Sequence, residues 1–355
     1  MSRFLQLHLL TFYPPANLNR DDTGRPKTAQ VGGVPRLRVS SQALKRAWRS
    51  SDVMRQALAG HMGMRTQRFG TLLHEHLLAR GVAGDVATTA VRKLLPLLGK
   101  EKPEKDKNPL YTEQLAFISP EEATTAYALA EQIAGGERTE AKAEDLLRRT
   151  DTAADIAMFG RMLADAPDFN REAAVQVAHA ITTHKSVVED DFYTAVDDLK
   201  KPAEDAGAGF VGEQGFGSGV FYLYACIDLA LLFKNLGGDA VLAGTACAAL
   251  VEAAATVAPS GKQNSFAARA RAEYVLAERG DAQPRTLAGA FAQPVSGEDL
   301  MGGSIQRLKE FRDRIDACYG AAAEAPVELD VLAGTGSLAA LVGFCREAAA
   351  SCSKS

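Results

Sequence analysis

The stretch RLRVSSQALKRAWR, residues 36 to 49, gathers side chains that are suited to binding a chain of phosphates. If Ser40 or Ser41 caps a helix that starts near Gln42, a rotation of about 100° per residue brings the polar and basic side chains onto one stripe. That stripe holds Gln42, Lys45, Arg46 and Arg49, and the opposite side holds Leu44, Ala47 and Trp48. Free backbone N–H groups and the helix dipole both favour an anion at such an N-terminus. A solvated amphipathic helix has the same pattern, so the stripe alone does not decide the function.

The distribution of charge supports a basic surface near the N-terminus. The 355-residue chain has a formal net charge of −4, which by itself argues against nucleic acid. Residues 1 to 50 nevertheless carry nine Lys or Arg against two Asp, a local charge of +7 that leaves −11 for the rest of the chain. The nine are Arg3, Arg20, Arg25, Lys27, Arg36, Arg38, Lys45, Arg46 and Arg49. Such a polarised chain is expected to present one basic surface on an acidic body.

Two loop segments carry further candidate residues. PSGKQNS, residues 259 to 265, resembles a phosphate loop only in part, because it lacks the first Gly and has Gln where Ser or Thr would bind magnesium. Lys262 and Gln263 within it are either contacts to a nucleic acid or solvated loop residues. In NRDDTG, residues 19 to 24, Asp21 and Asp22 could bind a divalent metal that cleaves a phosphodiester, although such residues more often form a turn.

The histidines do not predict a metal site. His74 and His76 would lie about 200° apart on the helix that their neighbours predict, so they cannot bind one ion together. His179 and His184 are five residues apart and would point to opposite faces of a strand. We therefore expect no metal and no other cofactor.

The sequence favours a cytoplasmic protein. Its five cysteines are widely spaced and form no C-x-x-C pair, so reduced thiols are expected. The N-terminal MSRFLQLHLLTFYPP lacks the small-residue cleavage site of a signal peptide. The longest apolar run elsewhere, VFYLYACIDLALLF, is interrupted by Asp228 and is shorter than the roughly 20 residues of a spanning helix. No membrane partner is expected.

The elements that would position these residues predict an α+β protein with an insertion. Residues 3 to 13 alternate leucines with Gln6 and His8, which predicts a strand that is buried on one face. Residues 36 to 40 alternate again and would bring Arg36 and Arg38 near the phosphate-binding helix. Residues 51 to 168 read as a helical insertion, and strands and helices interleave again from about residue 172. A Gly-rich segment between two strand-like runs predicts a protruding hairpin.

Six motifs in order resemble one known family. They are LNRDD (18–22), RVSSQALKRAWR (38–49), GRM (160–162), AHAITTH (178–184), TAVDDL (194–199) and SGVFYLYA (218–225). Together they are similar to the backbone-forming, guide-RNA-binding subunit of type I-E CRISPR surveillance complexes (Cascade). Residues 60 to 150 and those after 265 contribute little to this resemblance.

The resemblance implies a fold like a right hand. An RRM-like (ferredoxin-like) palm would comprise residues 1–50 and 169–355, helical fingers residues 51–168, and a β-hairpin thumb residues 198–219. Copies of such a subunit assemble head to tail along one guide RNA (crRNA), which makes an open helical filament. Each thumb kinks the guide, and the bases between kinks pair with target DNA. The other implied partners are a large subunit, a small subunit, a subunit that caps the guide 5′ end and a guide-processing endoribonuclease.

The resemblance also assigns roles to individual residues and implies no catalytic activity. The predicted contacts to the guide backbone are Arg20, Lys27, Ser40, Gln42, Lys45, Arg46 and Arg49, with Lys262 and Gln263 added. The residues predicted to lie at the kink are Arg161, Met162, Phe192 and Tyr193. The position of Phe192 can be Trp in the family, so its stacking role is a hypothesis.

Two alternatives remain open on the sequence. One is a metal-dependent RNA-cleaving backbone subunit that uses Asp21 and Asp22, since related subunits in other CRISPR types cut RNA. The other is a generic RNA-binding module outside CRISPR systems, which would not assemble into filaments of defined length.

Overall fold

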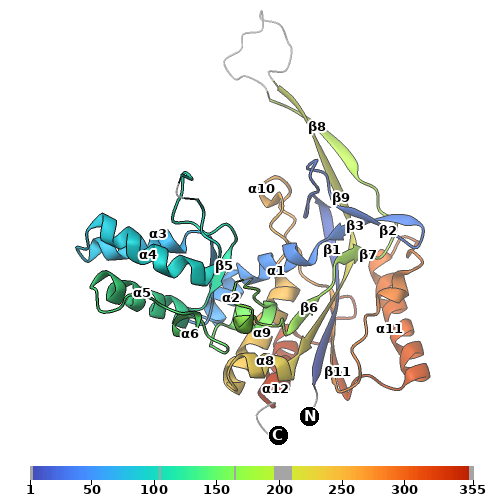
Figure 1. The fold of residues 1–355 in the computed structure, drawn as a ribbon. Helices are drawn as coiled ribbons and strands as arrows, with labels where there is room; N and C mark the ends of the chain where they lie inside the picture. Colours follow the sequence, from blue (N-terminus) through green and yellow to red (C-terminus); the bar gives the residue numbers. More distant parts are fainter. Residues whose placement is uncertain (1–2, 104, 164, 196–209, 352–355) are drawn as a thin grey trace, which may run out of the picture.

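The protein combines a large antiparallel sheet with helices on both faces, which confirms the predicted mixture of helices and strands (Figure 1). The structure is a computed structural model that describes residues 3–103, 105–163, 165–195 and 210–351. None of the helices in these ranges is long and apolar enough to cross a membrane.

The sheet is built around two long strands that pair with each other, β1 (Phe4–Ala16) and β9 (Phe210–Asp228). β10 (Tyr274–Gly280) lies on the other side of β1, and β11 (Ala325–Asp330) follows it at one edge. Beyond β9 the order continues with β7 (Ala180–Thr182), β3 (Val34–Val39) and β2 (Thr28–Val31). The short β6 (Val175–Val177) also pairs with β9. All these pairings are antiparallel, so long-range contacts between distant segments hold the sheet together.

The central strand β1 is buried on both faces, and the prediction of one buried face is wrong. Leu5, Leu7 and Leu9 enter the main apolar core on one side of the sheet. The side chains of Gln6 and His8 are also buried, on the other side, where α11 (Leu300–Tyr319) and the short helix η2 (Ala288–Phe291) cover the sheet. Polar residues are tolerated in this layer because they find hydrogen-bond partners there.

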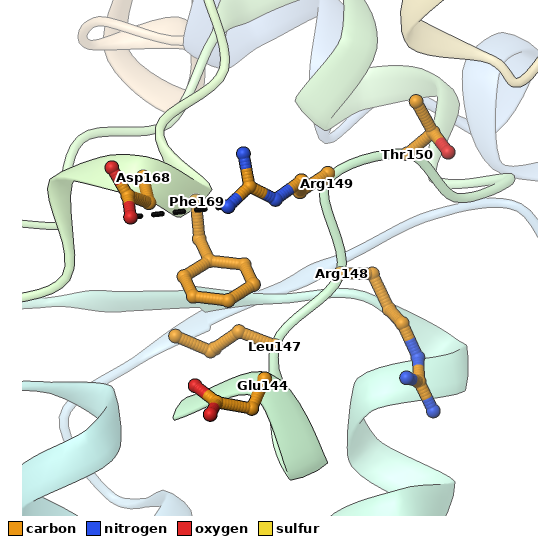
Figure 2. Close-up of a pocket in the computed structure, with 7 residues that line it drawn as sticks. All are labelled: Glu144, Leu147, Arg148, Arg149, Thr150, Asp168 and Phe169. Carbon is orange, nitrogen blue, oxygen red and sulfur yellow. Dashed lines mark ion pairs between the residues drawn. The ribbon is translucent and has the colours of Figure 1, made fainter. Parts of the chain in front are cut away.

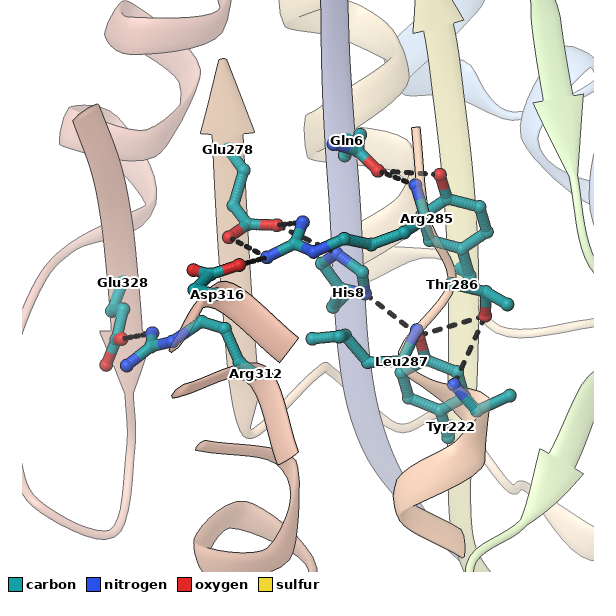
Figure 3. A network of polar contacts seen from close by, with 12 residues as sticks. Gln6, His8, Tyr222, Glu278, Arg285, Thr286, Leu287, Arg312, Asp316 and Glu328 are labelled. Atoms are coloured by element: carbon teal, nitrogen blue, oxygen red, sulfur yellow. Dashed lines mark hydrogen bonds and ion pairs between the residues drawn. The ribbon is translucent and has the colours of Figure 1, made fainter. Parts of the chain in front are cut away.

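Figure 3 shows the polar network that satisfies these side chains. His8 Nδ1 lies 2.8 Å from the Tyr222 hydroxyl and its Nε2 lies 3.2 Å from Glu278 Oε2. Arg285 forms a salt bridge with the same carboxylate at 2.7 Å. Burial lowers the pKa of His8, so we infer a neutral imidazole that donates through Nε2. Burial alone would raise the pKa of Glu278, but hydrogen bonds from His8 and Arg285 lower it to about 2.

The opposite face of the sheet is covered by a layer of helices around α9 (Ala240–Thr256). Almost every side of α9 is apolar, which is expected of a helix surrounded by protein. Its neighbours in this layer are α1 (Ser41–Arg49), α2 (Asp52–Ala57), α7 (Ala154–Phe159), α8 (Leu229–Asn235) and α12 (Leu338–Ala350).

A helical unit beside the sheet has an apolar core of its own. It contains β4 (Met64–Thr66), α3 (Phe69–Ala79), α4 (Gly84–Leu98), β5 (Ala116–Ile118), α5 (Pro120–Ala134), α6 (Ala143–Leu146) and the short helix η1 (Pro167–Phe169). α2 and α7 fall within the predicted fingers, 51–168, but pack on the sheet layer instead. The separate core is therefore narrower than the predicted insertion.

A hairpin of β8 (Glu189–Ala195) and the first part of β9 projects from the sheet (Figure 1). Its register runs from Glu189 opposite Phe216 to Ala195 opposite Phe210. The hairpin begins nine residues before the predicted thumb, 198–219, because residues 189–195 already pair with β9. Positions 198–209 of that prediction lie outside the described residues.

Candidate nucleic-acid interface

Helix α1 and its cap have the arrangement that the sequence predicts. The Ser40 side chain accepts a hydrogen bond from the Ala43 backbone N–H, and Leu44, Ala47 and Trp48 are buried. Asn19 fixes the cap from outside the helix, because its Oδ1 accepts the Ser40 backbone N–H at 2.9 Å. The start of α1 is thereby tied to the loop that carries Arg20.

An open groove of about 610 Å³ lies at the start of α1. Its walls are the loop at 18–21, the first turn of α1 and the loop at 259–262. Five of the predicted RNA-binding residues, which come from three separate parts of the sequence, line it: Arg20, Ser40, Gln42, Arg46 and Lys262. Figure 1 shows α1 between the helical unit and the sheet, with α10 (Gln263–Phe266) near its start.

The charge of this groove suits an anion. Arg20, Arg46 and Lys262 are exposed and contribute three positive charges, whereas Asp21 is the single acidic residue among those that line it. The first turn of α1 contains no acidic residue, so nothing in it opposes an anion at the helix N-terminus. A groove with exposed cations and free backbone donors can bind successive phosphates without reading a base.

Lys45 and Arg49 lie on α1 but do not line the groove. Lys45 Nζ lies 5.8 Å from the centre of the Phe159 ring, and burial lowers its pKa. Arg49 Nε donates to Asp155 Oδ2 at 2.9 Å. Asp155 is fully buried, so Arg49 has a structural role as the partner of a buried carboxylate in addition to the predicted one.

Lys27 belongs to a second basic cluster next to the groove. Arg38 donates a hydrogen bond to His179 Nδ1 at 2.7 Å. Burial lowers the pKa of His179, and the positive charges of Arg38 and Lys27 lower it further. A neutral ring that accepts from Arg38 leaves the Arg38 and Lys27 charges unopposed.

Residues 5–338 match the model of a family described as CT1975-like protein. The chain belongs to this family. No curated protein gives a significant match.

Two solved structures are similar to this CT1975-like protein over nearly its whole length. A chain of a "CRISPR RNA-guided surveillance complex, pre-nicking" is 31% identical with a TM-score of 0.86, and the alignment covers 98% of this chain and 100% of that one. A chain of a second "CRISPR RNA-guided surveillance complex" is 26% identical with a TM-score of 0.74, and the coverage is 98% and 99%. The shared fold therefore includes both the sheet and the helical unit.

The structure contradicts the predicted RNA contact of Arg161. Its side chain is 1% exposed and forms a salt bridge with the buried Glu122 at 2.5 Å. The guanidinium also donates to the backbone carbonyls of Phe117, Arg148 and Phe169. It holds β5, α5 and the loop before α7 together, so it has no donor to offer a ligand.

Gln263 is also misassigned. Both of its polar atoms are used or enclosed within the loop: Nε2 donates to the carbonyls of Pro259 and Ala268, and Oε1 is buried. Lys262, one residue earlier, is exposed and lines the groove.

The predicted apolar contacts lie outside the groove on exposed positions. Met162 is 82% exposed, next to the buried Arg161. Phe192 and Tyr193 are 70% and 47% exposed on β8. Tyr193 covers Gly212 on the paired strand, where a Cβ would collide with the ring. Exposed large apolar side chains of this kind are suited to contact a displaced base.

Asp21 forms a turn, and its geometry does not resemble a metal ligand. Its Oδ1 accepts hydrogen bonds from the backbone and hydroxyl of Thr23 and from the backbone N–H of Arg25. The Thr23 hydroxyl is the main cause of the lowered pKa of Asp21. Within the described part of the chain, no three His, Cys, Asp or Glu side chains cluster as metal ligands would.

A second cavity, of about 640 Å³, lies in the helical unit beside η1 (Figure 2). Arg149 lies there between the Phe169 ring, 5.5 Å from its centre, and Asp168, whose carboxylate is 3.8 Å away. None of the predicted site residues lines this cavity, and its charges are of both signs.

Sequence reasoning missed the residues that position the groove. Asn17 is buried and its Nδ2 donates both to Gly24 O in the loop and to Gly215 O in the hairpin strand, at 3.0 Å each. Asn19 caps from the same loop. Asn19 lies within the LNRDD motif, so that motif was the available signal, but its role depends on a contact 21 residues away.

Proposed function

We propose that this CT1975-like protein is a crRNA-binding backbone subunit of a CRISPR surveillance complex. One observation carries the proposal: five residues predicted from a resemblance to guide-RNA-binding subunits converge on one basic groove. The two similar solved chains come from complexes that are named as RNA-guided, which supports the same ligand.

The chemistry of the groove agrees with a scaffold that must accept any guide sequence. Arg20, Arg46 and Lys262 offer charge to phosphates, and the N-terminus of α1 offers backbone donors. Phosphate contacts fix the register of a nucleic acid but carry no sequence information. Base pairing between guide and target DNA then supplies the specificity.

We further infer a type I-E complex, from the motifs in RVSSQALKRAWR and AHAITTH. In this proposal the sheet around β1 and β9 is the RRM-like palm, the helical unit the fingers and the β8–β9 hairpin the thumb. Copies assemble head to tail along the guide and kink it at regular intervals. The large and small subunits, the subunit that caps the guide 5′ end and the guide-processing endoribonuclease complete the complex.

We propose no catalytic role for this subunit. Asp21 and Asp22 are adjacent, and Asp21 already accepts three hydrogen bonds within its own turn. A two-metal site needs several positioned carboxylates, which this turn does not supply.

The test is to purify the chain from cells that express a CRISPR array with the other subunits, and to sequence the RNA that accompanies it. We expect uniform RNAs that each carry one spacer and are protected along a defined length. Heterogeneous RNA would indicate a generic RNA-binding module, and the absence of RNA would contradict the proposal.

A further inference from the structure

We propose that Gln263 is a positioning residue that holds Lys262 in the groove and does not touch RNA itself. The inference rests on the proposed function, because it concerns how one cation is presented to the guide backbone. It assigns a role to the loop at 259–268, which contains α10.

The backbone of this loop needs an external restraint. Lys262 and Ala267, on either side of α10, have φ angles of +52° and +50°. They are the only non-glycine residues with positive φ in the described ranges. An L-residue in this left-handed region is destabilised relative to its usual conformation, and the surrounding structure must hold it there.

The Gln263 side chain supplies that restraint across the neck of the loop. Its Nε2 donates to Pro259 O at 2.8 Å and to Ala268 O at 3.1 Å, so one amide joins the residues at which the loop starts and ends. A primary amide has only two N–H donors, and both are used here. The side chain therefore acts inside the loop.

Two further contacts fix the orientation of the closed loop. Gly261 lies against the backbone of Leu18 so closely that a Cβ would collide with the Leu18 carbonyl. The ring of Phe266 lies 6.2 Å from that of Phe216 on β9. The loop thus rests on the opposite wall of the groove and on the strand that leads to the hairpin, and Lys262 lies between these contacts.

The consequence is that a neutral side chain controls a charged contact. Each phosphate contact on single-stranded nucleic acid contributes about 0.7 to the slope of log affinity against log salt, because it releases counterions. If Gln263 acts through Lys262, its loss lowers this slope. If Gln263 instead donates a hydrogen bond to RNA, its loss weakens binding but leaves the slope unchanged.

The experiment compares the full-length protein with Lys262→Ala, Gln263→Ala and the double variant. Binding to a short fluorescent single-stranded RNA of mixed sequence is followed by anisotropy across a salt titration. We expect each single variant to lower the slope by up to about 0.7 and the double variant to lower it no further. Asn264→Ala removes an exposed neutral amide one residue later and is the matched control, with no change expected.

Three results would overturn the inference while leaving the proposed function intact. They are a Gln263→Ala variant that binds like wild type, one that loses affinity at an unchanged slope, and losses that add in the double variant. Failure of the wild-type protein to bind RNA would overturn the proposed function and this inference together. Thermal unfolding checks each variant, and Gln263→Met, which keeps side-chain length but removes both donors, replaces Gln263→Ala if that variant does not fold.

Discussion

Replacing Arg161 should lower stability and leave RNA binding intact, because its guanidinium is the partner of a buried carboxylate. The Arg161 and Glu122 side chains are 1% and 0% exposed. Breaking a buried ion pair by removing one partner costs about 3–5 kcal/mol. Glu122 keeps hydrogen bonds from the backbone N–H groups of Ser119 and Arg148, so we expect Arg161→Met to fall near the lower end, about 3 kcal/mol.

Equilibrium unfolding in urea measures this loss, and the folded protein is then tested for RNA affinity. Met162→Ala is the matched control because Met162 is the next residue and is 82% exposed. We expect it to change stability by less than about 0.5 kcal/mol but to weaken RNA binding, the reverse of Arg161→Met. Adding Glu122→Gln to Arg161→Met should recover part of the stability, since no unpaired charge then stays buried.

A different outcome would refute this reasoning. If Arg161→Met has the unfolding midpoint of wild type and binds RNA with a smaller salt dependence, the guanidinium contacts RNA as the sequence predicted. Equal losses of stability in the single and double variants would show that the Glu122 charge is not the cause.

Three further predictions address stacking, pH and catalysis. Phe192→Ala should weaken RNA binding by about 1–3 kcal/mol at an unchanged salt slope, because stacking releases no counterion; a reduced slope would contradict this. The pKa of His8 is below its unfolded value of 6.5, so the unfolded state binds more protons and stability should fall as pH drops below 6.5. His8→Gln should make that fall shallower by up to about 1.4 kcal/mol per pH unit, measured as urea stability against pH; an equally steep fall would show that His8 is protonated when folded. Asp21→Ala with Asp22→Ala should leave RNA stability in magnesium unchanged, and cleavage that only wild type performs would revive the enzymatic alternative.

Local patterns predicted the elements of the site well. The cap at Ser40, the buried side of α1 and the exposed positions of Gln42 and Arg46 all follow from residue types at helical spacing. The alternation of leucines in residues 3 to 13 likewise predicted β1. These features depend on neighbours within a few residues, which a sequence shows directly.

The roles of buried polar residues could not be predicted in this way. Alternation shows that Gln6 and His8 share a face, but only the fold shows that α11 covers that face. The same ambiguity affected Arg36, which was expected near the basic helix. It is fully buried and donates to the carbonyls of Thr182 and Phe291, far along the chain. Arg36 and Arg161 look like surface cations in the sequence because their partners are backbone carbonyls and distant carboxylates.

The first 50 residues illustrate the same limit for charge. Their formal charge of +7 overstates the basic surface, because Arg3 pairs with Asp228, Arg25 with Asp190 and Arg49 with Asp155. The usable charge is confined to the groove and to the neighbouring cluster of Lys27 and Arg38. Composition located the basic region, and ion pairs between distant residues determine how much of it faces solvent.

The most direct test of the central claim, that the groove at the start of α1 binds the RNA backbone, is the salt slope of a double variant. Arg46→Ala with Lys262→Ala removes two of the groove's cations, and Lys234→Ala with Arg314→Ala removes two exposed cations from α8 and α11 as the control. We predict a slope reduced by about 1.4 for the groove variant and unchanged for the control. Equal slopes in the two variants would contradict the account and place the RNA elsewhere on the protein.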